Sequence, residues 1–131
     1  MIAIDAPVLI RFLTQDHAEQ GALVRGLIGT LTPQDPVFVA REVLCEAVAI
    51  LEQSYGLSRG EIAQALDALL EAEEVVVEAV DRVGLALSRY RAGGPGFADQ
   101  MIVLAGRDAG ATTCYTFDPR TAELVEATLL S

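Results

Sequence analysis

The chain has 131 residues, 52% hydrophobic content and a formal net charge of −10 at pH 7. This length suits one domain with a single core, so we predict one domain over residues 1–131. All nine basic residues are arginines, which excludes P-loop nucleotide hydrolysis and Schiff-base chemistry because both need a lysine. The negative net charge also disfavours nonspecific binding of nucleic acids, because such binding depends on neutralising phosphates. A nucleic-acid substrate would need local arginines or bridging metal ions.

The apolar runs are too short to cross a membrane, which takes about 20 residues. The first apolar stretch lacks a basic lead and stops at Asp5, unlike a signal peptide. We therefore expect a cytoplasmic protein with no membrane association. Cys45 and Cys114 form no CxxC unit and stand in apolar surroundings, which predicts buried free thiols over a disulfide or a zinc site.

In chain order, hydrophobic periodicity predicts strands that alternate with helices. The first half contains a strand at 1–5, helices at 6–13 and 18–31, a turn at 33–36, a strand at 37–40 and a helix at 41–55. The second half contains a capped helix at 58–71, a strand at 75–77, a helix at 79–91, a glycine-rich loop at 92–96, a helix at 98–108, a strand at 113–117 and a weaker helix or mixed tail at 120–130. This alternation predicts an α/β fold, a three-layer α/β/α sandwich with a central, mostly parallel sheet.

Four acidic residues stand out in this arrangement. Asp5 and Asp118 each end an apolar strand, and the carboxyl ends of parallel strands form the site edge of a sheet, so both can face one crevice. Glu46 and Asp99 lie in largely apolar, helix-like stretches. Buried carboxylates are costly unless they are paired or bind a metal. The four acids therefore indicate metal chemistry.

Each acid also has an ordinary structural alternative. Asp5 and Asp99 can cap the helices that they precede or begin, and Asp118 can be a turn residue. Glu42 lies four residues before Glu46, on roughly the same helix face. From local sequence alone, either glutamate can be a solvated surface acid.

Four segments carry a more specific signal when they are taken in order. They are MIAIDAPVLIRFLTQD at 1–16, VLCEAVAIL with YGLS at 43–58, GFAD at 96–99 and TFD at 116–118. Together they resemble a PIN domain of the VapC toxin type over nearly the whole chain. In that family an aspartate ends the first strand, and a glutamate helix, a DFAD segment and a TFD strand end follow. The resemblance assigns the acidic role to Glu46 over Glu42.

The resemblance implies an endoribonuclease of a type II toxin–antitoxin pair, with an RNA substrate, a small antitoxin that inhibits it, and a homodimer. It makes Asp5, Glu46, Asp99 and Asp118 the catalytic and metal-binding residues. Their hard oxygen donors, with no companion His or Cys, favour Mg²⁺ or Mn²⁺ over zinc. Such an ion activates a bound water and neutralises charge that develops on a phosphodiester.

The chain departs from the family pattern at two places. Family members often read Asp-Thr-Asn at the first motif, where this chain has Ala6 and Pro7, and Gly96 stands where many relatives carry an extra aspartate. The alternative is therefore a catalytically weakened PIN module that acts mainly as a protein-binding partner. A phosphoacceptor receiver domain, also α/β, needs a lysine that this chain lacks.

Basic side chains offer weaker signals for contacts with a substrate. His17 stands in a polar helix start, where a structural role is favoured over a catalytic one. Four arginines are candidates for local phosphate contacts, although each is more typical of a solvated surface: Arg11, Arg41, Arg89 and Arg91.

Overall fold

The structure, a computed structural model, describes all residues from 1 to 131. The chain forms two compact units, Met1–Val80 and Asp81–Ser131. Each unit has strands that pair in parallel and helices that connect them. The predicted α/β class is therefore confirmed, whereas the single domain stays a prediction.

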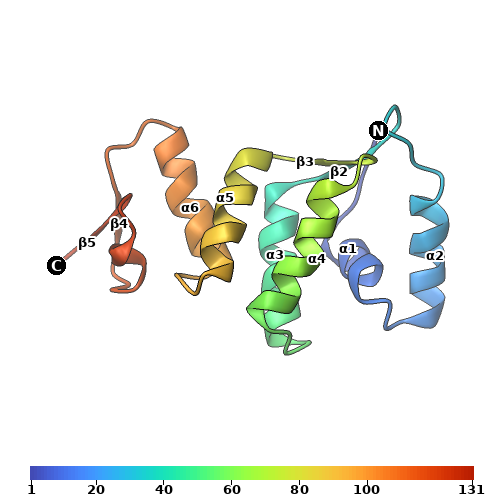
Figure 1. Cartoon of the computed structure of the whole chain (residues 1–131), viewed down its shortest axis with the longest axis horizontal. Coiled ribbons are helices and arrows are strands. Elements are labelled where there is room, and N and C mark those ends of the chain that lie inside the picture. The colour runs from blue at the N-terminus through green and yellow to red at the C-terminus, as the bar shows by residue number, and fades with distance from the viewer. The chain divides into compact units, whose positions relative to one another are not determined.

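The N-terminal unit is built on a three-stranded parallel sheet with the order β1-β2-β3 (Figure 1). Its strands are β1 (Ile2–Ala3), β2 (Val37–Val39) and β3 (Val75–Val77), and its helices are α1 (Ala6–Thr14), α2 (Ala18–Ile28), α3 (Arg41–Gln53) and α4 (Arg59–Glu71). In the register, Val37 faces Ile2 on one side and Val75 on the other. Because β2 is the central strand, Val37 and Val39 are fully buried, at 1% and 0% exposed.

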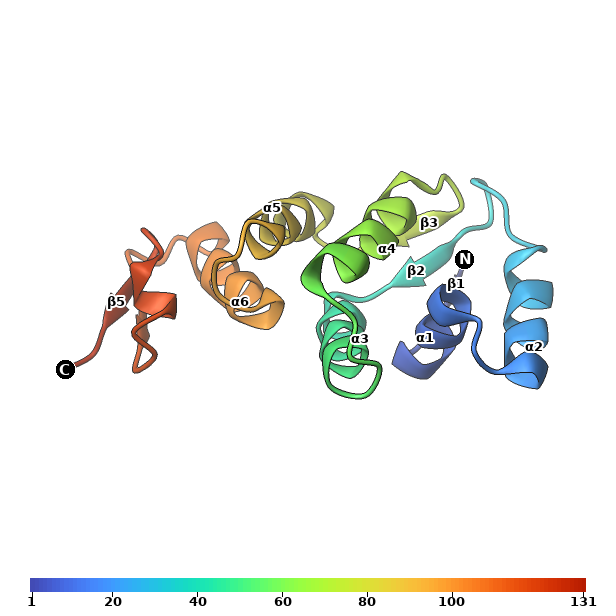
Figure 2. The same cartoon turned by 60° about the horizontal axis from the view of Figure 1, so that its bottom comes forward.

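The helices of this unit begin and end where their sequence dictates. Ser58 caps α4, and its side chain and that of Glu61 each accept a hydrogen bond from the other's backbone N–H, as a capping box requires. Gly56 follows α3 with φ +63, a conformation that is cheap only for glycine. In both views α1 lies beside α2, and α3 lies beside α4 (Figures 1 and 2).

The C-terminal unit contains two helices and a two-stranded parallel sheet. Its elements are α5 (Val80–Arg91), α6 (Phe97–Asp108), β4 (Cys114–Thr116), the 3-10 helix η1 (Thr121–Glu123) and β5 (Ala127–Leu129). The two helices run side by side (Figures 1 and 2). Tyr90 and Phe97 pack edge to face at the loop between them, with ring centroids 6.1 Å apart.

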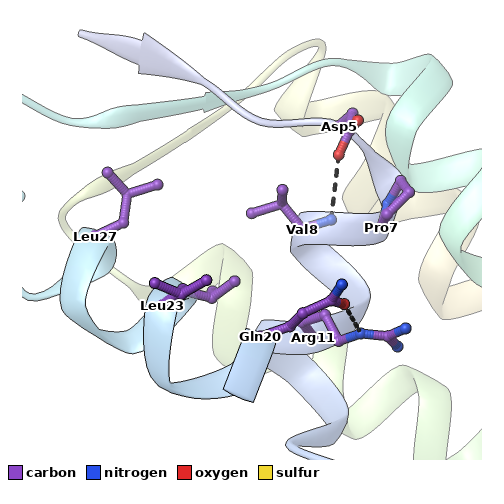
Figure 3. A pocket seen from close by; sticks show the side chains of 8 residues that line it. Asp5, Pro7, Val8, Arg11, Gln20, Leu23 and Leu27 are labelled. Carbon is purple, nitrogen blue, oxygen red and sulfur yellow. Dashed lines mark hydrogen bonds between the residues drawn. The ribbon is translucent and has the colours of Figure 1, made fainter. Parts of the chain in front are cut away.

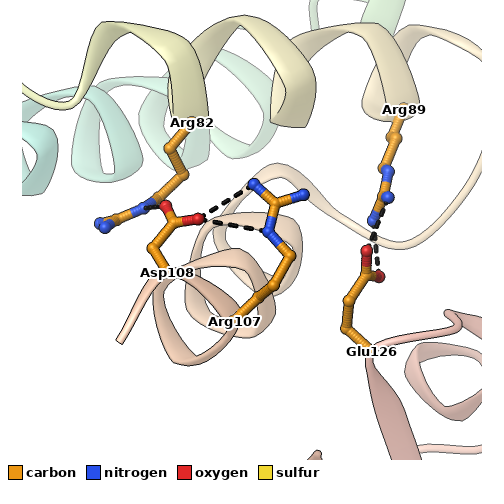
Figure 4. Close-up of polar contacts among 5 residues, drawn as sticks. All are labelled: Arg82, Arg89, Arg107, Asp108 and Glu126. Atoms are coloured by element: carbon orange, nitrogen blue, oxygen red, sulfur yellow. Dashed lines mark hydrogen bonds and ion pairs between the residues drawn. The ribbon is translucent and has the colours of Figure 1, made fainter. Parts of the chain in front are cut away.

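Arginine–carboxylate pairs connect the segments of the C-terminal unit (Figure 4). Arg89 of α5 binds Glu126 with two hydrogen bonds of 2.8 Å, Nη1 to Oε1 and Nη2 to Oε2. Glu126 in turn accepts the Cys114 amide through its backbone oxygen at 2.9 Å, which begins the β4–β5 pairing. The Arg89 pair therefore holds the sheet of this unit against α5.

The predicted elements agree with the observed ones to within a few residues, with one exception. The segment at 120–130, predicted as a weaker helix or mixed tail, forms η1 and then the strand β5. A three-residue strand next to a helical turn is too short to show a period, and its partner β4 supplies the hydrogen bonds that define it. No helix in the chain is long and apolar enough to cross a membrane.

Candidate functional site

Asp5 lies between β1 and α1 and caps that helix. Its Oδ1 accepts a hydrogen bond of 3.2 Å from the backbone N–H of Val8, and its extended backbone, with φ −95 and ψ −178, is that of an N-cap residue. The capping alternative is thus correct for Asp5. The cap uses one carboxylate oxygen, and the side chain is exposed, so Oδ2 is left available for a cation.

A cavity of about 350 Å³ adjoins Asp5 between α1 and α2 (Figure 3). Its walls are mostly apolar, with Val8 facing Leu23 and Leu27. Arg11 donates from Nε to Gln20 Oε1 at 2.7 Å and thereby ties the two helices together. The carboxylate of Asp5 points toward the Val8 amide, to which it is hydrogen-bonded.

Glu46 projects from α3 into solvent, so its predicted burial is wrong. Its neighbours Leu44, Ala47 and Val48 are at most 2% exposed, because the helical period turns them to the core and turns Glu46 to the opposite face. Glu46 makes no hydrogen bond or ion pair, whereas Glu42 receives a hydrogen bond of 3.1 Å from Arg41 Nε. Of the two glutamates, Glu46 has the uncompensated charge.

Asp99 and Asp118 line the same cavity, of about 180 Å³, in the C-terminal unit. Asp99 is the third residue of α6, where the helix dipole favours a negative charge. It is exposed and makes no hydrogen bond or ion pair, so its predicted burial is also wrong. The capping alternative is wrong too, because Gly96 is the N-cap. The remaining lining residues are Ile102, Val103, Cys114, Tyr115, Thr116 and Thr121.

The turn after β4 holds both carboxylate oxygens of Asp118. Oδ1 accepts the Arg120 amide at 3.1 Å, and Oδ2 accepts the hydroxyl of Thr121 at 2.8 Å. The Asp118 amide donates to Thr116 Oγ1 at 3.0 Å. The Thr121 hydrogen bond, followed by that of the Arg120 amide, lowers the pKa of Asp118 below its ordinary value. The predicted turn is therefore present, and it keeps the side chain ionised.

Two threonines near Asp118 were given no role from the sequence, although Thr116 belongs to the TFD segment. Thr116 and Thr121 both bind Asp118 and line its cavity. The signal for Thr121 was present, because an aspartate followed by proline and then, at the third position, by threonine is typical of a helix start whose cap is hydrogen-bonded. Val8 stands three residues after Asp5, as Thr121 does after Asp118. Its side chain has no donor, so only its backbone N–H donates a hydrogen bond to the aspartate.

The acids of each unit do not form a closed metal cage. In neither unit do three or more His, Cys, Asp or Glu side chains converge as metal ligands. The N-terminal unit supplies Asp5 and Glu46, and the C-terminal unit supplies Asp99 and Asp118 in one cavity. Both cysteines are free, but they are half-buried, whereas the sequence predicted buried thiols. Burial raises the pKa of the Cys45 thiol, which disfavours the thiolate that a metal needs.

Most of the basic candidates have structural partners. Arg11 donates to Tyr55 Oη at 3.0 Å as well as to Gln20, and Arg89 is paired with Glu126. His17 caps α2, with Nδ1 accepting the Gln20 amide at 3.0 Å. The structure therefore gives Arg11, Arg89 and His17 roles in holding segments together.

Comparisons with known proteins give matches that span nearly the whole chain. The family model described as "PIN domain" matches residues 2–126. Among solved structures, the chain is similar to Mycobacterium tuberculosis VapC20, described as a sarcin-ricin loop cleaving toxin, with 22% identity, 94% of each chain covered and a TM-score of 0.46. Comparison with curated proteins finds no match.

Proposed function

The chain belongs to the PIN domain family, and on that premise we propose that it is a metal-dependent endoribonuclease of the VapC toxin type. The α/β sandwich predicted from the sequence follows from this membership. The observation that carries the proposal is the cavity shared by Asp99 and Asp118. Two acids from separate elements meet there, as a site for a divalent cation requires.

The donor set fits Mg²⁺ or Mn²⁺. Asp5, Glu46, Asp99 and Asp118 offer only carboxylate oxygens, which are the ligands that these hard cations prefer. Glu46 and Asp99 have no partner within the chain, so their charges are free to bind a cation. We propose Asp5, Glu46, Asp99 and Asp118 as the catalytic and metal-binding residues, as the family resemblance implies.

The residues contribute to hydrolysis in different ways. When bound, a divalent ion lowers the pKa of a coordinated water and neutralises charge on the phosphodiester. Asp5 is held by the helix that it caps, and Asp118 is held by the turn that follows it, so we assign them as fixed ligands. Glu46 and Asp99 lack such bonds and are free to adjust.

The proposal is tested with purified, antitoxin-free protein and RNA in Mg²⁺ or Mn²⁺. We expect cleavage that EDTA stops, and Asp99→Asn should lower the rate by about 100-fold or more, because it removes a full charge worth several kcal/mol at the metal. Glu42→Gln is the matched control and should cleave normally. Full activity of Asp99→Asn, or equal losses in both variants, would contradict the assignment.

The partners and location follow from the same family membership as proposals. We infer an RNA substrate, a small cognate antitoxin, a homodimer and a cytoplasmic location. The strongly acidic chain, with net charge −10, favours a basic antitoxin segment, because complementary charge speeds association and selects partners.

Pro7 favours the alternative of a catalytically weakened module that mainly binds a protein partner. It stands beside Asp5 in the cavity wall and lacks the amide that an asparagine would offer to a carboxylate or a metal-bound water. Losses of such supporting groups typically cost about 10- to 100-fold in metal affinity or activity. A thermal-shift titration with Mn²⁺ distinguishes the nuclease from the weakened module. Mn²⁺ at one hundred times Kd should stabilise a protein with an intact metal site by about 2.7 kcal/mol, and it should not stabilise a module without one.

A further inference from the structure

A buried threonine at the start of η1 binds the exposed carboxylate of Asp118 through its hydroxyl. Thr121 is 5% exposed, and its Oγ1 lies 2.8 Å from Asp118 Oδ2. A carboxylate accepts hydrogen bonds and cannot donate them, so the hydroxyl is the donor. We propose that Thr121 is a positioning residue, whose hydroxyl fixes the orientation of the Asp118 carboxylate toward the cavity shared with Asp99.

The geometry favours a positioning role because the two carboxylate oxygens are fixed from two directions. The Arg120 amide holds Oδ1 at 3.1 Å, and the Thr121 hydroxyl holds Oδ2 at 2.8 Å. One hydrogen bond would leave the carboxylate free to rotate about that contact. Two bonds, one to each oxygen, define the plane of the group, and each oxygen keeps lone pairs for the cavity.

Thr121 is itself held in place, which makes its hydroxyl an effective constraint. It is the first residue of η1, and the backbone oxygen of Asp118 accepts the Ala122 amide at 3.0 Å, which closes the turn. The hydroxyl also lines the cavity that contains Asp99. Since the backbone fixes both ends of the contact, losing the hydroxyl releases the carboxylate without moving the turn.

Two variants separate positioning from simple packing. Thr121→Val keeps the volume of the side chain and removes the donor, whereas Thr121→Ser keeps the donor and removes a buried methyl group. If the hydrogen bond orients Asp118, Thr121→Val should lose the fixed orientation of the carboxylate and Thr121→Ser should keep it. If the packing of the side chain orients Asp118, Thr121→Ser should lose that orientation and Thr121→Val should keep it. Thr128→Val is the control, because its hydroxyl contacts Thr113 at 2.7 Å in the same unit.

The first measurement is the side-chain rotamer of Asp118 in the metal-free protein, from three-bond NMR couplings. We expect one χ1 rotamer in the wild type, Thr121→Ser and Thr128→Val, and averaging over rotamers in Thr121→Val. A single rotamer in Thr121→Val would overturn the inference. Should Thr121→Val fail to fold, Thr121→Ala also lacks the hydroxyl, and the same comparison applies to it.

The second measurement is the affinity for Mn²⁺ alone, by electron paramagnetic resonance, and it rests on the proposed function. Thr121→Val should bind Mn²⁺ about 10-fold or more weakly than wild type, as for other groups that orient a ligand, and Thr121→Ser should restore binding. Equal affinities in all variants would refute the positioning role toward the metal. If the wild type binds no Mn²⁺, the metal site fails, while the rotamers still decide whether Thr121 orients Asp118.

Discussion

Removing Arg89 should lower the free energy of unfolding by the amount that its ion pair with Glu126 contributes. The pair has two hydrogen bonds of 2.8 Å, and the side chains are 27% and 12% exposed. Exposed pairs contribute about 0.2–1 kcal/mol, whereas breaking a fully buried pair costs about 3–5 kcal/mol. The pair lies between these limits, so we expect Arg89→Met to lose about 2 kcal/mol at pH 7.

The loss should depend on pH because Arg89 lowers the pKa of Glu126 in the folded state. A carboxyl group with a lowered folded pKa stabilises the fold fully above its unfolded pKa, about 4.3 for glutamate, and loses that contribution as the pH falls through the folded value. The difference between wild type and Arg89→Met should therefore shrink on acidification from pH 7 to below that unfolded pKa.

Urea unfolding followed by circular dichroism measures both effects. Arg41→Met is the control, because the Arg41–Glu42 pair is 49% and 71% exposed and should contribute little. Equal losses in the two variants at pH 7 would refute the reasoning. A loss in Arg89→Met that stays constant on acidification would also contradict it, since the energy would then come from packing of the arginine stem.

Three further predictions concern the start of α1. Asp5→Asn should keep the helix cap and the stability while it lowers Mn²⁺ affinity, whereas Asp5→Ala should also lose about 1 kcal/mol of unfolding free energy, as calorimetry would show. Equal stabilities of these two variants would mean that the cap has no energetic effect. Ala6→Thr should cost about 1–3 kcal/mol because Ala6 is 1% exposed and a larger side chain overpacks the core. Pro7→Asn, at an exposed position, should instead raise Mn²⁺ affinity or cleavage, and no change in either would show that position 7 does not support the site.

Much of the fold could be predicted because its elements carry local signals. The capping box at Ser58 and Glu61 marked the start of α4, and the β-branched run at Val75–Val77 marked β3, both as the structure has them. The strand β5 could not be found in this way. Its three residues owe their conformation to pairing with β4, a contact between segments that no local pattern records.

The candidate site was predicted less completely, for two physical reasons. The apolar neighbours of Glu46 and Asp99 suggested that both acids are buried. A helix turns adjacent residues to different faces, however, so an exposed acid can stand between core residues in the sequence. The capping of α1 by Asp5 was foreseen as an alternative to its role in the site. The cap uses only Oδ1, which accepts the Val8 amide, so the proposed role of Asp5 as a metal ligand can still use Oδ2.

The central claim is that four carboxylates bind a divalent cation, and crystals soaked in Mn²⁺ test it most directly. Anomalous scattering locates the ion without any assumption about activity. We predict a peak at metal–ligand distance, about 2.0–2.6 Å, from Asp99 and Asp118, and we propose Asp5 and Glu46 as further ligands. A peak bound by other residues, or coordination that omits Asp99 and Asp118, would contradict it.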